Sequence, residues 1–257
     1  MSIRVLRSGV LDTIQDNGRF GYSKWGINPG GAMDRYAAQV ANALVGNPLG
    51  DAVIEIPFPG GEFQFHKDSL ICLTGADFTP CINETVVKPW KTIAVKKDSI
   101  LTFTRKQKGC RCYLAIHGGL SIDPWLGSMS TNLKVRAGGL NGGALKKNDV
   151  IPFGPTRYSL QPDLKEKGFC ELPWSVNAFK IYDRPEEISF LEGNEWKWLT
   201  AESQEYVLSG EFVIDPASDR MGYYLDHNQL LFQKRHELLS SAVTFGPIHA
   251  LPGARMA

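Results

Sequence analysis

An arginine close to an acidic residue near the amino terminus is the first feature that could do chemistry. It stands in Gln15-Asp16-Asn17-Gly18-Arg19. On one interpretation, Asp16, Asn17 and Gly18 form a tight turn, because these residue types tolerate positive φ, and Arg19 is a surface charge. On the other, Asp16 supports Arg19, whose planar guanidinium binds a carboxylate or phosphate. The second interpretation makes Arg19 a candidate substrate-binding residue.

Small hydroxyl and amide residues gather in a second motif, Gly127-Ser128-Met129-Ser130-Thr131-Asn132, and a glycine-rich segment follows at 138–143. Ser, Thr and Asn offer donors and acceptors that do not titrate, and glycine lets a ligand approach the backbone. The motif either recognises an amide, ureido or carboxylate group or is a polar loop of a β protein, and it supplies no general base. The candidate substrate-binding residues here are Ser128, Ser130, Thr131 and Asn132.

Two further motifs are weaker candidates. His117-Gly118-Gly119 ends a predicted strand, and without a paired nucleophile we interpret His117 as structural and the two glycines as supporting the site. Ser218–Tyr223 is typical of a turn held by an Asp219–Arg220 contact, with Arg220 as a second anion contact. No catalytic residue is identified. The sequence contains no P-loop, nucleophile elbow or metal-ligand spacing, so we expect no metal and find no ATP-binding motif.

The composition sets the class of protein. Among 257 residues, 43% are hydrophobic, and 26 glycines and 15 prolines favour many short strands joined by turns. The net charge of +1 argues against a nucleic-acid-binding protein. Residues 1–9 lack the apolar stretch of a signal peptide, and no segment is apolar enough to span a bilayer. Five cysteines suggest no disulfide framework, and we expect a reduced, cytoplasmic protein with Cys110 and Cys112 buried.

Strands dominate the predicted elements. Alternating or continuous apolar runs predict strands at 3–5, 53–56, 62–65, 70–73, 91–95, 100–104, 110–116 and 149–153. An apolar stripe predicts a helix over 34–45, capped by Asp34 and ended by Gly46, and the preceding loop offers backbone N–H groups to an anion. Residues 155–175 are predicted to connect two halves. The second half is predicted to hold strands at 179–182, 190–192, 211–214 and 230–232 and a short helix at 195–201.

Seven blocks, in order, resemble the KipA/PxpC family, the type that includes allophanate hydrolase subunit 2 and the C subunit of 5-oxoprolinase. They lie at 15–19, 30–34, 41–47, 73–77, 118–119, 127–132 and 218–223. The resemblance implies a mainly β fold of tandem cyclophilin-like β-barrels with a few short helices. Residues 1–160 would form the N-terminal half and 161–257 the C-terminal half. The relatives' Asp-Arg-Gln-Thr-Thr-Gly-Gly-Tyr segment is missing, so we expect the C-terminal half to be either truncated or that of a divergent member.

The same resemblance implies a function. It points to the PxpC-type subunit of an ATP-dependent 5-oxoprolinase, which converts 5-oxoproline to L-glutamate and is not active alone. The implied partners are a KipI/PxpB-like protein and a PxpA-like protein, and ATP acts at the level of the complex. One alternative is a biotin-dependent carboxyltransferase component of urea carboxylase or allophanate type, with biotin on a separate carrier. Another is a KipA-like antagonist of a KipI-type sensor-kinase inhibitor.

Overall fold

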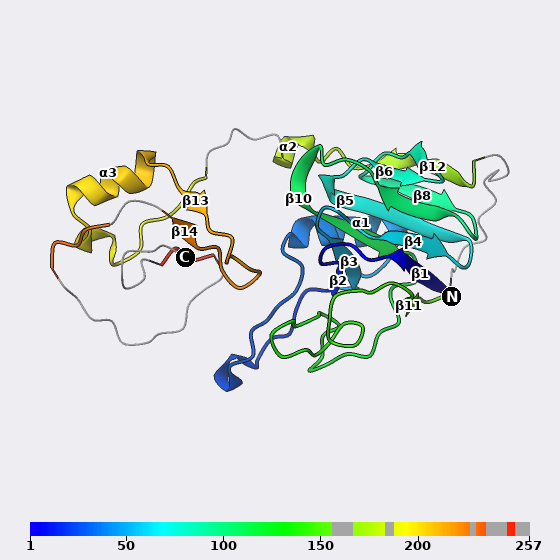
Figure 1. Cartoon of the computed structure of the whole chain (residues 1–257), viewed down its shortest axis with the longest axis horizontal. Helices are drawn as coiled ribbons and strands as arrows, with labels where there is room; N and C mark the ends of the chain where they lie inside the picture. The colour runs from blue at the N-terminus through cyan, green and yellow to red at the C-terminus, as the bar shows by residue number, and fades with distance from the viewer. Residues whose placement is uncertain (156–166, 183–187, 227–229, 235–245, 250–257) are drawn as a thin grey trace. The chain divides into compact units, whose positions relative to one another are not determined.

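The computed structural model describes residues 1–155, 167–182, 188–226, 230–234 and 246–249 (Figure 1). They fall into two compact units, Met1–Asp183 and Arg184–Ala257, and each unit is described by itself. The sequence placed the division between halves at residue 160. The compact units divide later because strand β12 (Phe169–Ser175) pairs with β8 (Lys91–Val95) of the first unit.

Two six-stranded antiparallel sheets form the first unit (Figure 1). In spatial order, the first sheet contains β11 (Val150–Pro152), β1 (Ser2–Arg7), β4 (Glu62–Phe65), β9 (Ile100–Phe103), β6 (Pro80–Ile82) and β7 (Thr85–Val86). The second contains β12, β8, β5 (Ser69–Asp77), β10 (Lys108–Ile116), β3 (Val53–Ile56) and β2 (Thr13–Gln15).

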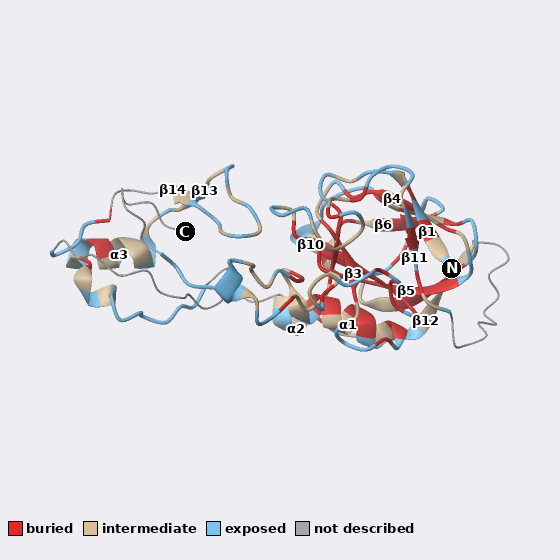
Figure 2. Cartoon of the chain, turned by 90° about the horizontal axis from the view of Figure 1, so that it is seen from below, coloured by how far each residue is buried: buried red, intermediate tan, exposed pale blue. Residues whose placement is uncertain are grey.

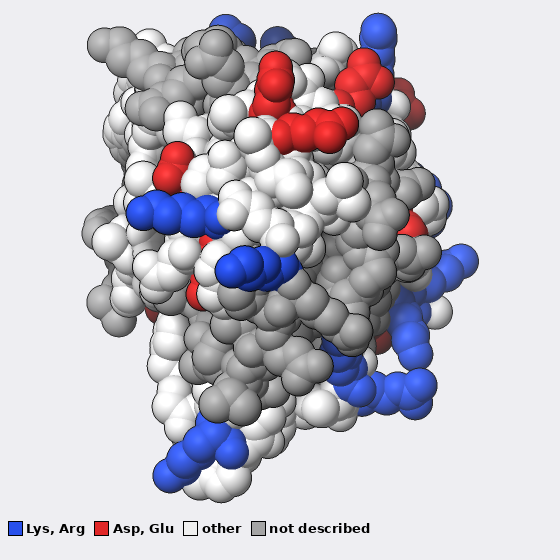
Figure 3. All heavy atoms as spheres, turned by 90° about the vertical axis from the view of Figure 1, so that its left-hand side faces the viewer, with Lys and Arg blue, Asp and Glu red and all other residues white. Residues whose placement is uncertain are grey.

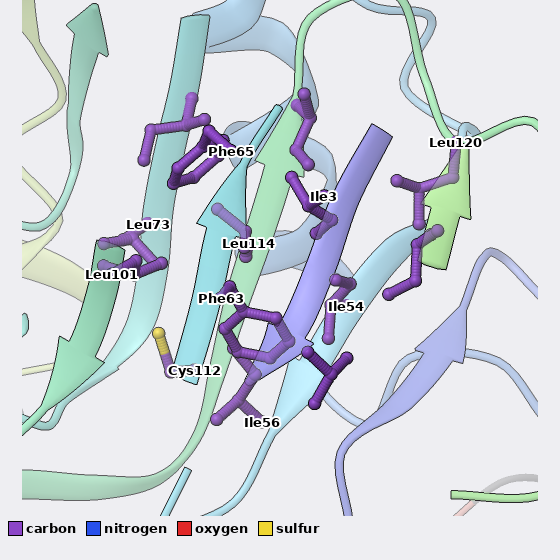
Figure 4. Close-up of a cluster of buried hydrophobic side chains, with 14 of the residues drawn as sticks. Ile3, Ile54, Ile56, Phe63, Phe65, Leu73, Leu101, Cys112, Leu114 and Leu120 are labelled. Carbon is purple, nitrogen blue, oxygen red and sulfur yellow. The ribbon is translucent and has the colours of Figure 1, made fainter. Parts of the chain in front are cut away.

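The main hydrophobic core lies between these sheets (Figures 2 and 4). On β1, Ile3 and Val5 are buried while Arg4 between them is exposed, which is the alternation of a strand with one wet face. On β3 every residue is buried, because the second sheet is covered on both sides. Figure 4 shows Ile3, Phe63 and Leu114 among the side chains that the two sheets contribute.

Helix α1 (Arg35–Val45) covers the outer face of the second sheet. Its buried alanines and Val45 pack against side chains of β3, β5 and β10: Val53, Cys72, Tyr113 and Ala115. Asp34 caps the helix, since its Oδ1 accepts the N–H of Ala37 at 2.9 Å, and Gly46 ends it at φ 75°. Both predicted caps are confirmed.

Short elements complete the described chain. The first unit also holds the 3₁₀ turn η1 (Ser23–Trp25) and helix α2 (Phe179–Tyr182). The second unit holds η2 (Trp196–Trp198), helix α3 (Ala201–Ser209) and the hairpin of β13 (Val213–Ile214) with β14 (Leu225–Asp226). A small apolar cluster around Leu199 and Leu230 joins them.

The predicted mainly β class and all eight strands predicted in residues 1–155 are confirmed. Four predictions nearer the carboxyl end are wrong. Residues 179–182 form helix α2, residues 190–192 form no strand, only Phe232 of 230–232 makes an isolated bridge, and the expected connection contains β12. Cys112 is buried as predicted, but Cys110 is exposed, because β10 shifts register against β5 between Lys108 and Cys112.

The surface carries charges of both signs. The face of the molecule in Figure 3 carries described side chains of both signs, with several acidic ones near its upper edge. None of the helices in the described part of the chain combines the length and apolar composition needed to cross a bilayer.

Candidate functional site

Two loops bring the first two motifs together. The segment after β2 and the segment after β10 run side by side in Figure 1, as blue and green traces. The N–H of Asp16 donates to Ser130 Oγ at 2.9 Å, and the N–H of Thr131 donates to the carbonyl of Ile14 at 2.9 Å. Motifs separated by more than 100 residues in the sequence therefore form one cluster.

The Asp16 carboxylate organises this cluster. Its Oδ1 accepts the hydroxyls of Ser128 at 2.7 Å and Ser130 at 2.5 Å and the N–H of Gly18 at 2.7 Å. Its Oδ2 accepts the N–H of Met129 at 2.7 Å. Four donors fix the carboxylate, and the carboxylate in turn fixes the shape of the loop at 128–130.

Arg19 lies beside this carboxylate and is 2% exposed. Its Nη2 donates to the carbonyl of Ser130, and its Cζ lies 4.7 Å from the centre of the Trp125 ring, in cation–π geometry. Its Nε and Nη1 are buried and have no hydrogen-bond partner among the residues that the structure describes. A buried cation with two unused donors is suited to receive an anion.

Burial also sets the electrostatics of Arg19. Loss of solvent lowers the pKa of its guanidinium below the ordinary value, and the negative charge of Asp16 raises that pKa again to a smaller extent. Asp16 thus acts on Arg19 through its charge and through Ser130, whose hydroxyl it binds and whose carbonyl accepts from Arg19. An arginine remains a cation at neutral pH.

Two glycines leave room around the guanidinium. Gly30 has φ 64° and Gly138 has φ 69°, which is the left-handed region that favours glycine. A Cβ at Gly30 would lie 3.3 Å from Arg19 Nη1, and a Cβ at Gly138 would lie 3.0 Å from Arg19 Nη2. A side chain at either position would crowd the arginine.

The remaining predicted donors of the loop are also used within the chain. Thr131 Oγ1 donates to the carbonyl of Ile14 at 3.1 Å, and Asn132 Nδ2 donates to Asn28 Oδ1 at 3.0 Å. Ser128 and Ser130 donate to Asp16. All four predicted binding residues therefore lie in the cluster around Asp16 and Arg19, which we call the Arg19 cluster, and each donates to a protein acceptor. A direct contact of these side chains with substrate stays a prediction.

The other predicted site residues lie elsewhere. His117 is buried and its Nδ1–H donates to the carbonyl of Val45 at 2.6 Å, so it contacts the end of α1 as a structural histidine. The N–H of Gly118 donates to Asn47 Oδ1 at 2.9 Å, and a Cβ at Gly119 would lie 2.7 Å from Asp51 Oδ2. These glycines shape the turn that follows β10.

Arg220 belongs to the second unit. Its turn is present: Asp219 Oδ1 accepts the N–H of Met221 at 2.6 Å, and the N–H of Asp219 donates to the carbonyl of Gly222 at 3.1 Å. Burial lowers the pKa of Arg220 to about 10, against the opposing charge of Tyr223. A role for Arg220 in anion binding stays a prediction.

Sequence reasoning missed two members of the cluster, Trp125 and Asn28. Both stand in loops, where no periodicity indicates the direction of a side chain. The proximity of Trp125 to Ser128 along the chain was the one available signal. Within the described ranges, no group of three or more His, Cys, Asp or Glu side chains is placed to hold a metal ion.

Comparison with known proteins decides the family. Residues 25–256 match the model of the carboxyltransferase domain, subdomain A and B. The chain belongs to this carboxyltransferase-domain family. Over 246 residues it is 32% identical to the 5-oxoprolinase C subunit of Escherichia coli, covering 96% of this chain and 75% of that protein. It is 30% identical to the protein of the same name from Haemophilus influenzae, covering 95% and 74%.

The chain is also similar to urea-processing enzymes. Urea amidolyase of Saccharomyces cerevisiae is 36% identical over 151 residues, which are 58% of this chain and 8% of that protein. The crystal structure of TTHA0988 superposes with a TM-score of 0.76 at 26% identity, covering 99% of this chain and 47% of the other. Kluyveromyces lactis urea carboxylase gives 0.74 at 26% identity, covering 91% and 21%. The chain thus spans less than half the length of these solved relatives, and the resemblance predicted from the seven blocks is confirmed.

Proposed function

We propose that this chain is the PxpC-type subunit of an ATP-dependent 5-oxoprolinase, which opens 5-oxoproline to L-glutamate. The observation that carries the proposal is the similarity to the Escherichia coli C subunit, which extends over nearly the whole of this chain. In the complex it acts with a KipI/PxpB-like protein and a PxpA-like protein. The expected site of action is the cytoplasm.

Arg19 gives this proposal a chemical basis. The lactam amide of 5-oxoproline is resonance-stabilised, so its hydrolysis needs activation, which ATP supplies at the level of the complex. The substrate also carries a carboxylate. In the proposal, the free donors of Arg19 bind that carboxylate, because charge-assisted hydrogen bonds are stronger than neutral ones. Ser128 and Ser130 hold Asp16 and the loop in place around Arg19.

A second candidate function is carboxyl transfer from biotin to a urea-type nitrogen. The higher identity to yeast urea amidolyase, over a shorter stretch, favours it. In that case Arg19 would bind the carboxylate of carboxybiotin, carried on a separate protein. The 5-oxoprolinase function is preferred because the similarity to the 5-oxoprolinase relative covers far more of the chain.

Reconstitution tests the proposal. The PxpA-like and PxpB-like proteins are mixed with and without this chain, and glutamate formed from 5-oxoproline is measured with and without ATP. We expect glutamate only when all three proteins and ATP are present, and we expect avidin to have no effect. An equal rate without this chain contradicts the proposal, and inhibition by avidin supports the carboxyltransferase. Binding of the PxpB-like protein without any turnover supports a KipA-like antagonist.

A further inference from the structure

Trp125 is fixed beside Arg19 by its own backbone. Its N–H donates to the carbonyl of Ser128 at 2.9 Å, and the N–H of Ser128 donates back to the carbonyl of Trp125 at 3.2 Å. Leu126 and Gly127 between them have φ 50° and 74°, so the four residues form a hairpin with a two-residue turn of positive φ. The position of the Trp125 ring is therefore set by the loop that carries Ser128.

The same turn is tied to the carboxylate beside Arg19. Ser128 Oγ donates to Asp16 Oδ1 at 2.7 Å, and the Arg19 Cζ lies 4.7 Å from the centre of the Trp125 ring. Asp16 and Arg19 belong to one short motif of the chain. A shift of the ring away from the guanidinium would therefore have to break the turn or the hydrogen bond from Ser128 to Asp16.

The Trp125 ring covers one face of the guanidinium and leaves its edge to a ligand. A cation over the face of a tryptophan is attracted by the ring, most strongly where water is excluded, and Arg19 is 2% exposed. The N–H donors of the planar group point outward in its plane. Nη2 donates to the carbonyl of Ser130, while Nε and Nη1 have no partner among the described residues. A ligand therefore reaches Arg19 edge-on, at one of these two nitrogens.

Gly30 leaves a space next to Nη1. It is exposed and has φ 64°. A Cβ at this position would lie 3.3 Å from Arg19 Nη1 and 4.0 Å from Ser130 Cβ. Because glycine has no Cβ, the space that a side chain would fill adjoins the unpartnered Nη1, and the residue that borders it is open to solvent. A small group such as a carboxylate can enter there.

We propose that Trp125 is a positioning residue, which holds the Arg19 guanidinium with Nη1 toward the space beside Gly30, where a small carboxylate binds. The inference rests on the proposed function for the identity of the ligand, whose carboxylate is the one next to the lactam N–H of 5-oxoproline. Trp125 acts through Arg19, and Gly30 admits the ligand. Because the carboxylate is not the group that reacts, loss of this orientation weakens substrate binding, which raises KM more than it lowers kcat.

Kinetics in the reconstituted complex test the role of the ring. Trp125→Leu should raise the KM for 5-oxoproline about tenfold, which corresponds to about 1.4 kcal/mol, and leave kcat and the KM for ATP within about twofold. Trp125→Phe keeps a ring over the cation, so its KM for 5-oxoproline should stay within about threefold of the original. A tryptophan with a merely structural role would lower the amount of active complex, and so kcat, without a selective rise in one KM.

Trp25 provides the matched control. It is exposed and has Lys24 Nζ over its ring at 4.3 Å, so it forms the same kind of contact away from the Arg19 cluster. Trp25→Leu should change neither kcat nor KM. Equal KM values for 5-oxoproline in the Trp125→Leu and Trp25→Leu complexes overturn the proposal.

A double substitution tests whether Trp125 acts through Arg19. In Arg19→Met the ring has no cation to hold, so the addition of Trp125→Leu should change the KM for 5-oxoproline by less than about twofold. A second rise of about tenfold on top of that of Arg19→Met would show that Trp125 acts independently of the guanidinium, and the positioning role would then be wrong.

Two glycine variants locate the carboxylate. Gly30→Ala places a methyl group 3.3 Å from Nη1 and should raise the KM for 5-oxoproline at least about tenfold. Gly26 is also exposed, with φ 73°, and a Cβ there meets nothing within 4 Å. Gly26→Ala therefore brings a similar backbone strain without filling the space, and its KM should equal the original. The same KM in both variants would rule out the space beside Gly30 as the binding position.

Binding to the full chain alone separates the inference from the proposed function, because every residue of the Arg19 cluster comes from this chain. The indole N–H signal of Trp125 in a nitrogen–proton NMR spectrum, assigned by its absence in Trp125→Phe, is followed as ligand is added. We expect a saturable shift with millimolar 5-oxoproline and none with pyrrolidin-2-one, the same lactam without the carboxylate. The shift should be absent in Arg19→Met.

The two experiments together distinguish the possible failures. No shift of the Trp125 signal with 5-oxoproline, or equal shifts with both compounds, overturns the inference. A saturable shift without glutamate formation in the complex supports the inference and refutes the proposed function. Glutamate formation with an unchanged KM in Trp125→Leu refutes the inference alone.

Discussion

The Arg19 cluster and a cavity lined by Trp90 and Tyr182 belong to the same unit but are assembled differently. In the Arg19 cluster, the contiguous motif that ends in Arg19 lies against one loop, residues 127–132. Nearly every side-chain donor of the cluster binds an acceptor within the protein. In the cavity, side chains from distant segments surround an open space left by strands that stop pairing. Residue types in a short motif can reveal the first kind of site, whereas the second depends on where a sheet ends.

The largest expected effect comes from removing the centre of the cluster. Asp16→Ala leaves the hydroxyls of Ser128 and Ser130 and the N–H of Met129 without their acceptor. We expect the free energy of unfolding of the first unit to fall by about 3–5 kcal/mol, because three hydrogen bonds to a charged group, each worth about 1.5–3 kcal/mol, are lost. Urea denaturation followed by circular dichroism measures it.

The exposed Asp123 provides the control, and Asp123→Ala should change the free energy of unfolding by less than about 0.5 kcal/mol. An equal loss of stability in both variants would contradict a structural role for the Asp16 carboxylate.

A second carboxylate, Asp12, can be compared with Asp16, because the protein stabilises the negative charge of Asp12 less well. Burial raises the pKa of Asp12 to about 7, against smaller opposing effects of the Gly61 and Gly9 backbone and of Arg7. The folded state therefore binds the proton more tightly than the unfolded chain, and stability declines as the pH rises from about 4 to about 7. Asp12→Asn should be more stable than the original protein at pH 8 by about 2–4 kcal/mol.

At pH 4 the same substitution should bring no advantage, because Asp12 is then protonated in both states. Thermal denaturation at a series of pH values checks both statements, with Asp123→Asn as the exposed control. A constant difference between pH 4 and pH 8 would show that Asp12 ionises normally in the folded protein.

The smallest effect is expected for Tyr182→Phe. The substitution removes the hydrogen bond to Asp34 Oδ2, which is worth about 1 kcal/mol, but keeps the ring beside Trp90. The free energy of unfolding of the first unit, measured by urea denaturation, should fall by about that amount. Tyr36→Phe, on a half-exposed neighbour, serves as the matched control. Equal stability of the two variants would contradict a stabilising hydrogen bond from Tyr182 to Asp34.

The sequence predicted the parts of the fold whose pattern is set by burial. Strands such as β1 and β8 alternate or run continuously apolar because they face the core, and Asp34 and Gly46 mark the ends of α1 by their own chemistry. Strand β12 was missed because its residues are half-buried or exposed and show no alternation. Its place in the sheet comes from pairing with β8.

The candidate site was likewise predicted from the sequence only in part. The residue types around Arg19 and Ser128–Asn132 pointed to a polar cluster, and the structure places them together. The hydrogen bonds from the hydroxyls of Ser128 and Ser130 to Asp16 could not be predicted, because a hydroxyl donates to whichever acceptor the fold brings near. The contacts of Trp125 with Arg19 and of Trp90 with Tyr182 likewise depend on the paths of the loops that carry the two tryptophans, which no periodicity specifies.

Substitution of Arg19 tests most directly the claim that its guanidinium binds the substrate. Arg19→Met keeps much of the side-chain volume and removes the buried cation, and the exposed Arg105→Ala is the control. In the reconstituted complex, with folding verified by circular dichroism, we expect kcat/KM for ATP-dependent glutamate formation to fall about 10- to 100-fold in Arg19→Met. Arg105→Ala should keep the original rate. Equal rates for the two folded variants would contradict a substrate contact by Arg19.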